Sequence, residues 1–320
     1  MQQQTIPVVD LEHYLHGSPA QKQKFVSELG DALKECGFFA LQGHGVDHRL
    51  IEKAYKLSEA FFDLPDAAKK KYEEIELKGQ RGFTSFGREH AKGAAAADLK
   101  EFWHVGREFP LNHPLRKEYT PNFWPSEIPE FKEVMVELYR QLDVCSLRLL
   151  EACSIYIGED KDLLSGMATD GNTILRIINY PQVPEHRDAA AIRAGAHEDI
   201  NFITLLCEAT AGGLELLRRD GTWQPIHALK GQIIVDTGDM LQNLTNGLLK
   251  STTHRVVNPG NSKERRFSMP YFVHPRSEVK LNPLPKCVAS TGGATLFPDI
   301  TAGEYLDQRL KEIGLGRRKY

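Results

Sequence analysis

In the first half of the chain, apolar residues recur at the three- and four-residue spacing of helices that bury one face. Phe25, Leu29 and Leu33 follow one another at four-residue intervals, and a glycine comes next as a C-terminal stop. Residues 49–65 repeat this pattern and end on a proline. The spacing therefore predicts one helix within residues 21–37 and a second within residues 49–65.

A longer apolar stripe predicts a helix from about Glu130 to Tyr156. Between the first two predicted helices, residues 38–46 have the composition of a strand that is closed by glycines. The first half of the chain is therefore expected to be mainly helical. The stripe of the long helix consists of Val134, Leu138, Leu142, Cys145 and Leu149.

After Gly171 the pattern changes to short apolar runs separated by turn residues. Asp220-Gly221 is expected to form the tight primed turn of a hairpin, and Gly238-Asp239 a further turn. Many short strands with regular turns favour a sandwich or a jelly-roll barrel, with the preceding helices packed on its outside. The segments expected to carry strands are residues 172–181, 212–226, 231–241 and 265–275.

A length of 320 residues is within reach of one large β-rich domain, so we expect residues 1–320 to form a single unit. Its parts would be a helical region over about residues 1–165, a jelly-roll core over about 170–285 and a C-terminal tail helix within 286–320. The tail is amphipathic, and the pattern is equally consistent with a helix over the barrel mouth and with one on the solvated surface.

Composition narrows the classes of function. Hydrophobic content of 41% and charged content of 26% are ordinary for a folded globular chain. A net charge of −3 gives no electrostatic case for binding nucleic acid or an anionic membrane. The longest apolar stretches are strand-sized, far short of the ~20 residues that span a bilayer, and the N-terminus does not resemble a secretory signal.

The cysteines favour a cytoplasmic protein. They are odd in number, scattered, and without paired metal-binding spacing, so free thiols in a reducing cytosol explain them. They are Cys36, Cys145, Cys153, Cys207 and Cys287.

Metal-binding chemistry is concentrated in two segments. His197 and Asp199 are two residues apart, so on an extended strand both side chains project from one face. His254 lies far enough downstream for the chain to fold back and close the site. Two imidazoles and one carboxylate, with the opposite coordination positions free, are the ligand set of non-heme Fe(II) oxygenases.

Arg266 and Ser268 form a second pair at strand spacing. An arginine is always charged and can hold a carboxylate in two places, and a hydroxyl can add a further hydrogen bond. Alone, this pair also fits an edge strand whose polar side chains face water. Metal ligands followed by a carboxylate clamp suggest an oxidative enzyme that uses an organic acid.

Segments along nearly the whole chain resemble one family, the isopenicillin N synthase-like branch of the Fe(II)/2-oxoglutarate-dependent oxygenases. The resemblance implies a double-stranded β-helix (jelly-roll) core in which His197, Asp199 and His254 bind Fe(II). The segments that carry it include "TIPVVDL", "ALKECGFFALQGHGV", "RGFTSFG", "LRIINYP", "HEDINFITLL", "DTGDMLQNLTNGLLKSTTHRV" and "ERRFSMPYF".

The resemblance also implies 2-oxoglutarate as cosubstrate and O2 as oxidant. A small organic molecule would be hydroxylated, desaturated or cyclised, with release of succinate and CO2. Arg266 and Ser268 would hold the distal carboxylate of 2-oxoglutarate, and Tyr180 would reach the same cosubstrate. Ile178 stands where the family often has a polar residue, which puts one secondary cosubstrate contact in doubt.

Two alternatives stay open. An oxidase resembling isopenicillin N synthase itself would use the same iron ligands without 2-oxoglutarate, and Arg266 and Ser268 would then hold a substrate carboxylate. The "HED" triplet and Ile178 keep this alternative open. A non-catalytic iron or ligand sensor is the other alternative, although the intact ligand set argues against it.

Four further residues near these motifs are expected to stay off the metal. Glu198 lies between two ligands and should point away from them by strand alternation. His186, His227 and His274 lie in or near loops and are expected to be solvated.

Overall fold

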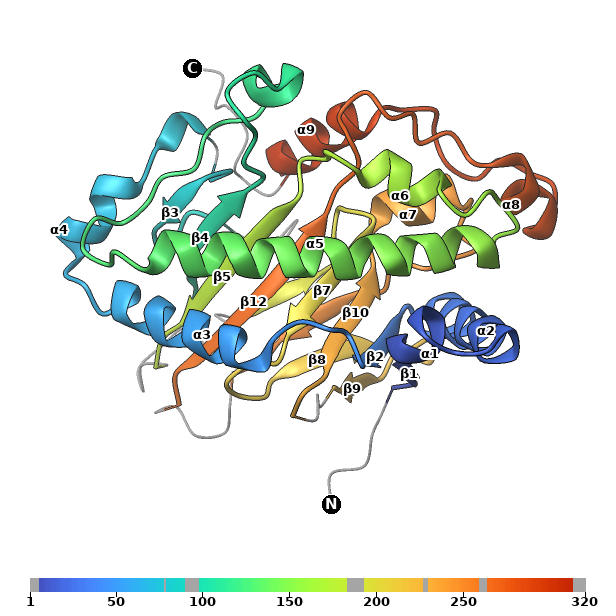
Figure 1. Ribbon diagram of the computed structural model, residues 1–320, viewed down its shortest axis with the longest axis horizontal. Helices are drawn as coiled ribbons and strands as arrows, with labels where there is room; N and C mark the ends of the chain where they lie inside the picture. Colours follow the sequence, from blue (N-terminus) through green and yellow to red (C-terminus); the bar gives the residue numbers. More distant parts are fainter. Residues whose placement is uncertain are drawn as a thin grey trace.

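The strands of the computed structural model form two sheets (Figure 1), and the structure describes residues 6–77, 79–89, 98–182, 193–226, 230–258 and 264–312. The larger sheet contains β1 (Val8–Asp10), β2 (Phe38–Gln42), β3 (Gly82–Thr84), β4 (Glu101–Gly106), β5 (Ile174–Tyr180), β7 (Ile203–Cys207), β10 (Ile233–Thr237) and β12 (Arg266–Val273). The smaller sheet contains β6 (Ala194–His197), β8 (Leu214–Leu217), β9 (Trp223–Pro225) and β11 (His254–Val256). The strand orders are β1-β2-β10-β7-β12-β5-β4-β3 and β6-β11-β8-β9.

The two sheets share a buried apolar layer. Ala40, Ile178 and Ile234 of the larger sheet belong to the same apolar cluster as Leu216 and Val256 of the smaller one. This layer is the interior of the predicted jelly roll, and the β-rich fold with flanking helices is confirmed.

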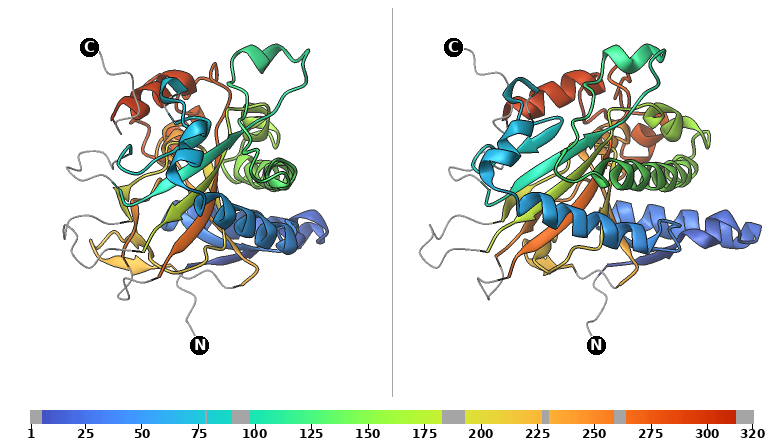
Figure 2. Two further views of the ribbon diagram at one scale, coloured as in Figure 1. Left: turned by 90° about the vertical axis from the view of Figure 1, so that its left-hand side faces the viewer. Right: turned by 60° about the vertical axis from the view of Figure 1, so that its left-hand side comes forward.

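Helices cover the outer face of the larger sheet. Figure 2 shows α5 together with α2 and α3 on one side of the larger sheet, and the smaller sheet on the other side. The apolar stripe predicted for the long helix is buried there. The helices are α1 (Leu11–Leu15), α2 (Pro19–Glu35), α3 (His48–Phe62), α4 (Asp66–Lys69), α5 (Phe131–Tyr156), α6 (Leu163–Ala168), α7 (Asp239–Leu244), α8 (Pro285–Ser290) and α9 (Ala302–Glu312).

Local sequence explains where α2 begins and ends. Ser18 and Gln21 form a capping box, in which each side chain bonds the other residue's backbone N–H. At the other end Gly37 takes a φ of 75°, and its N–H donates to the carbonyl of Ala32. A left-handed residue after the last turn favours glycine, which is why the predicted stop falls there.

The first half of the chain is less purely helical than predicted. It supplies β1 and β2 to one edge of the larger sheet, and β3 and β4 to the other edge. Every residue of β4 is buried, so neither face of this strand is selected to be polar, and its sequence "EFWHVG" shows no regular alternation of apolar and polar residues. Without that alternation, periodicity does not separate a buried strand from a buried helix.

Two predicted turns also differ in detail. In the hairpin of β8 and β9, Gly221 has a φ of 82° and its N–H donates to the carbonyl of Arg218. Asp220 is not among the positive-φ residues, so the loop is a longer one with a left-handed glycine, not a two-residue type I′ turn. Gly238 is the N-cap of α7 and does not form an isolated turn. No helix in the described part of the chain is long and apolar enough to cross a membrane.

Candidate active site

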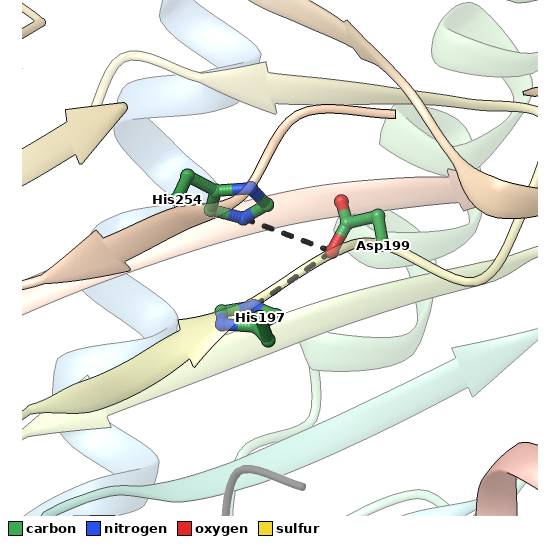
Figure 3. Close-up of side chains that lie close together, drawn as sticks. All are labelled: His197, Asp199 and His254. Carbon is green, nitrogen blue, oxygen red and sulfur yellow. Dashed lines mark ion pairs between the residues drawn. The ribbon is translucent and has the colours of Figure 1, made fainter. Parts of the chain in front are cut away.

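His197, Asp199 and His254 lie together where β6 ends and β11 begins (Figure 3). The two histidines are directly opposite each other across these paired strands, with ring centroids 4.5 Å apart. Oδ1 of Asp199 is 3.8 Å from Nε2 of each histidine. One donor atom from each residue therefore lies within 4.8 Å of the other two. Asp199 follows the end of β6, so it reaches the histidines from a loop and not from the strand face that we expected.

The two imidazoles are oriented for metal binding. Nδ1 of His197 is 2.7 Å from the carbonyl oxygen of Gly195, and Nδ1 of His254 is 3.2 Å from that of Thr252. Because a carbonyl only accepts, Nδ1 carries the hydrogen and each Nε2 keeps a free lone pair. Burial and the neighbouring His254 lower the pKa of His197 to about 4, so this imidazole is neutral at physiological pH.

Other side chains fix the carboxylate of Asp199. The hydroxyl of Thr204 donates to its Oδ2, and the amide of Asn201 donates to that hydroxyl at 3.0 Å. Burial and the adjacent charge of Asp199 raise the pKa of Asp236 well above its usual range. This environment favours the protonated form of Asp236, which can donate a hydrogen bond to Asp199.

This donor set fits a divalent transition metal. Two imidazole nitrogens and one buried carboxylate converge, and groups outside the set hold each ligand in place. Two cavities border these residues, so an ion held by them would be accessible to small molecules. The arrangement matches the open facial site of non-heme iron enzymes.

A cavity of about 60 Å³ lies beside the three residues, and both sheets contribute to its wall. Arg266, Ser268 and Tyr180 all line it, so the structure brings the predicted carboxylate clamp and the predicted metal ligands to one place. Arg266 and Tyr180 are cross-strand partners on β12 and β5. The guanidinium carbon of Arg266 lies 4.9 Å from the centroid of the Tyr180 ring.

The surroundings of Arg266 favour an anion. The residue is 2% exposed, and its Nε donates to the carbonyl of Ala211 at 3.0 Å. Within the described ranges its Nη1 has no hydrogen-bond partner and no carboxylate pairs with it. A buried cation without a counter-charge is costly, so a bound carboxylate would stabilise it. Ile178 lines the same cavity, so its wall is apolar where the family often has a polar residue.

A larger cavity of about 240 Å³ also borders His197 and Asp199. Its wall contains a buried ionic cluster in which Nζ of Lys100 lies 2.6 Å from Glu89 and 2.8 Å from Asp98. Arg176 donates to both oxygens of Glu89 at 3.1 Å. Burial alone would raise the pKa of Glu89, but Arg176 and Lys100 outweigh burial and hold that pKa well below its usual range. The charges of this cluster therefore compensate one another.

The C-terminal helix covers the larger cavity. Leu306, Arg309 and Leu310 of α9 line it. The helix is anchored because the hydroxyl of Tyr305 donates to Asp239 at 3.1 Å, and Arg309 pairs with the same carboxylate at 3.5 Å. Of the two placements left open for the tail, the one over the cavity is correct.

The expectation for His274 is wrong. It is only 7% exposed and lines the larger cavity, and burial lowers its pKa to about 4. His186 and His227 lie outside the described residues. Glu198 accepts a hydrogen bond from the hydroxyl of Thr253 and is not part of the three-residue metal group.

Sequence reasoning missed Asp236 and Lys100. Asp236 interrupts the apolar run "IIVDT" of a buried strand, and a charged residue there is a signal that could have been used. Lys100 precedes β4 and has no comparable signal, because exposed lysines are common in such positions.

Comparison with known proteins agrees with this geometry. Residues 6–127 match the model of the N-terminal region of the non-haem dioxygenase in morphine synthesis, and residues 172–275 match that of the 2OG-Fe(II) oxygenase superfamily. The 2-oxoglutarate-Fe(II) type oxidoreductase ppzD of Metarhizium rileyi is 30% identical, over 95% of this chain and 90% of its own length. The 2-oxoglutarate-dependent dioxygenase caaD of Aspergillus niger is also 30% identical, over 95% and 94%.

Solved structures are similar over almost the whole chain. A 2OG-Fe(II) oxygenase family protein from Caulobacter crescentus superposes with a TM-score of 0.86 and 41% identity, over 97% of this chain and 99% of that one. A full-length Neurospora crassa protein crystallised in complex with alpha-KG (2-oxoglutarate) gives a TM-score of 0.85 and 28% identity, over 97% of both chains. The names of ppzD and caaD and the alpha-KG complex support a 2-oxoglutarate-dependent dioxygenase over an oxidase that works without 2-oxoglutarate, and over a sensor.

Proposed function

The chain belongs to the 2OG-Fe(II) oxygenase superfamily, and on that premise we propose that His197, Asp199 and His254 are the ligands of its Fe(II) ion. The protein is an Fe(II)- and 2-oxoglutarate-dependent dioxygenase that acts on a small molecule. The observation that carries the ligand assignment is the convergence of the three donor atoms within 4.8 Å. The orientation of both imidazoles by backbone carbonyls supports it further.

Arg266, Ser268 and Tyr180 would hold 2-oxoglutarate in the smaller cavity. The unpaired guanidinium of Arg266 would bind the distal carboxylate, and the buried hydroxyl of Ser268 would add a hydrogen bond. What supports this placement is that the clamp lines the same cavity as the three ligands, so one molecule can reach both.

When bound, Fe(II) with 2-oxoglutarate and O2 supplies the oxidising power, and the cosubstrate leaves as succinate and CO2. The protein would bind the substrate in the larger cavity, where α9 excludes water. Hydroxylation, desaturation and cyclisation all begin with a substrate C–H bond held near the iron, so the shape of this cavity would decide among them.

We also propose that residues 1–320 work as one catalytic unit in the cytoplasm. Strands from the first half complete the larger sheet, which ties the helical region about 1–165 to the core about 170–285. Within the tail at 286–320, Tyr305 and Arg309 bind Asp239 of the core. All five cysteines are free thiols, as a reducing compartment would keep them. A net charge of −3 supports neither nucleic acid nor an anionic membrane as a partner.

Anaerobic titration of the Fe(II)-loaded protein with 2-oxoglutarate tests the site. The weak visible metal-to-ligand charge-transfer band should appear, and it should be absent in His197→Ala and Asp199→Ala. Gln141→Ala is a matched control, because Gln141 lies on α5 away from both cavities. Full iron binding and an unchanged band in both ligand variants would show that the assignment is wrong.

A further inference from the structure

A second buried arginine lies close to the carboxylate clamp. Arg193 immediately precedes β6 and is 0% exposed. Its Nη2 donates to the backbone carbonyl of Glu264, just before β12. Among the described residues, its Nε and Nη1 have no hydrogen-bond partner. The side chain therefore crosses from the smaller sheet toward the larger one with most of its donors unused.

Arg193 and Arg266 approach the same aromatic ring. The guanidinium carbon of Arg193 is 5.9 Å from the centroid of Tyr180, and that of Arg266 is 4.9 Å from it. Both distances are within the range of cation–π attraction. Tyr180 lines the smaller cavity, so Arg193 contacts a wall of the cosubstrate pocket through this ring.

The positive charges of these two arginines are only partly compensated: the carboxylate of Glu264 favours the charged form of Arg193, but less than burial and Arg266 oppose it. In the described part of the chain, neither arginine forms an ion pair with a carboxylate. Lys100 and Arg176, which line both cavities, differ because both pair with Glu89. Burial and the positive charge of Arg266 lower the pKa of Arg193, which reflects the cost of two like charges held close together. An anion in the smaller cavity would remove that cost.

We propose that Arg193 is a positioning residue for the distal carboxylate of 2-oxoglutarate. Arg193 fixes the ring of Tyr180 and adds a second positive charge behind Arg266. The inference rests on the proposed placement of 2-oxoglutarate at Arg266 and Ser268. Its consequence is selectivity: Arg193 should matter for a keto acid that has a distal carboxylate and not for one that lacks it.

Calorimetric titration of the Fe(II)-loaded protein without oxygen tests this with two ligands. 2-Oxoglutarate carries the distal carboxylate, and 2-oxopentanoate has a methyl group in its place. Arg193→Gln should weaken 2-oxoglutarate binding by about tenfold or more, as expected for the loss of a charge near a buried carboxylate, and change 2-oxopentanoate binding by less than about twofold. Arg193→Lys keeps the charge and should stay within about threefold of the wild type.

Two controls separate the possible failures. Arg81→Gln removes another buried arginine, one that bonds backbone carbonyls and Asn172, and it should leave the ratio of the two affinities unchanged. Arg266→Gln should abolish the preference for 2-oxoglutarate. If Arg266→Gln leaves that preference intact, the proposed cosubstrate site is wrong; if only Arg193→Gln leaves it intact, the role of Arg193 alone is wrong.

Equal weakening of both ligands by Arg193→Gln would show a purely structural role and overturn the inference. So would an Arg193→Lys protein that loses as much affinity as Arg193→Gln. If Arg193→Gln does not fold, Tyr180→Leu is compared with Tyr180→Phe, which keeps the ring. The inference requires the larger selective loss in Tyr180→Leu, and equal losses would contradict it.

Discussion

Glu89 forms ion pairs with Lys100 and Arg176, two cations that line both cavities, so Glu89→Gln is an informative perturbation. Glu89 is 8% exposed. Its carboxylate lies 2.6 Å from Nζ of Lys100 and accepts a hydrogen bond from each of Nη1 and Nη2 of Arg176 at 3.1 Å. The substitution keeps the shape of the side chain and removes its charge. Lys100 would retain Asp98, but Arg176 would lose the only carboxylate with which it pairs in the described structure.

The magnitude follows from that uncompensated cation. Breaking a buried ion pair from one side costs about 3–5 kcal/mol, and the remaining pair of Lys100 with Asp98 argues for the lower end of that range. We therefore expect the free energy of unfolding at pH 7 to fall by about 3 kcal/mol. Denaturation by guanidinium chloride, followed by circular dichroism, measures it as a shift of the midpoint at unchanged slope.

At acidic pH the difference in the free energy of unfolding between the wild type and Glu89→Gln should become smaller. The pKa of Glu89 is lower in the folded protein than in the unfolded chain, so its stabilising effect is present above the unfolded pKa of about 4.3. As the pH falls below that value, the wild type should lose stability relative to Glu89→Gln, and the two unfolding curves should converge.

Glu137→Gln is the matched control, because Glu137 pairs with Arg140 on the exposed face of α5 and should contribute little. A loss below about 1 kcal/mol in Glu89→Gln at pH 7, or a difference that does not shrink in acid, would refute the reasoning. Either result would mean that water or another carboxylate compensates Arg176.

Three further outcomes follow from the site. Arg266→Ala should raise the KM for 2-oxoglutarate by about 100-fold or more, since it removes a buried charge-assisted clamp. Its iron content, measured by a colorimetric assay, should stay near that of the wild type, and a parallel loss of iron would contradict the separation of cosubstrate binding from iron binding. Asp236→Asn should retain iron affinity at pH 7 within about threefold, because burial beside Asp199 favours the protonated acid and an amide can donate to Asp199 in the same way. A large loss of affinity in a metal-competition titration would show that the charged carboxylate of Asp236 is needed. Removal of iron with a chelator should lower the melting temperature, and adding Fe(II) should restore it; identical melting curves with and without iron would argue against a metal held by these residues.

The sequence alone predicted the elements whose signals are local. The helix from Phe131 to Tyr156 was predicted almost to its ends, because one apolar stripe runs along its whole length. The glycine after α2 marked its end for a backbone reason that needs no tertiary contact. The order of His197, Asp199 and His254, followed by Arg266 and Ser268 and set in segments that resemble one family, was the basis for expecting a metal centre.

Tertiary structure decided everything that depends on burial and on contacts between distant segments. No pattern marks Arg193 or Lys100 as special, because an isolated cation in a sequence is usually solvated. Their significance comes from the ring of Tyr180 beside Arg193 and from the carboxylate of Glu89 beside Lys100, which the fold brings next to them. The interaction energy of a charged side chain depends on its surroundings. The surroundings of these residues exist only after both sheets have closed around the cavity.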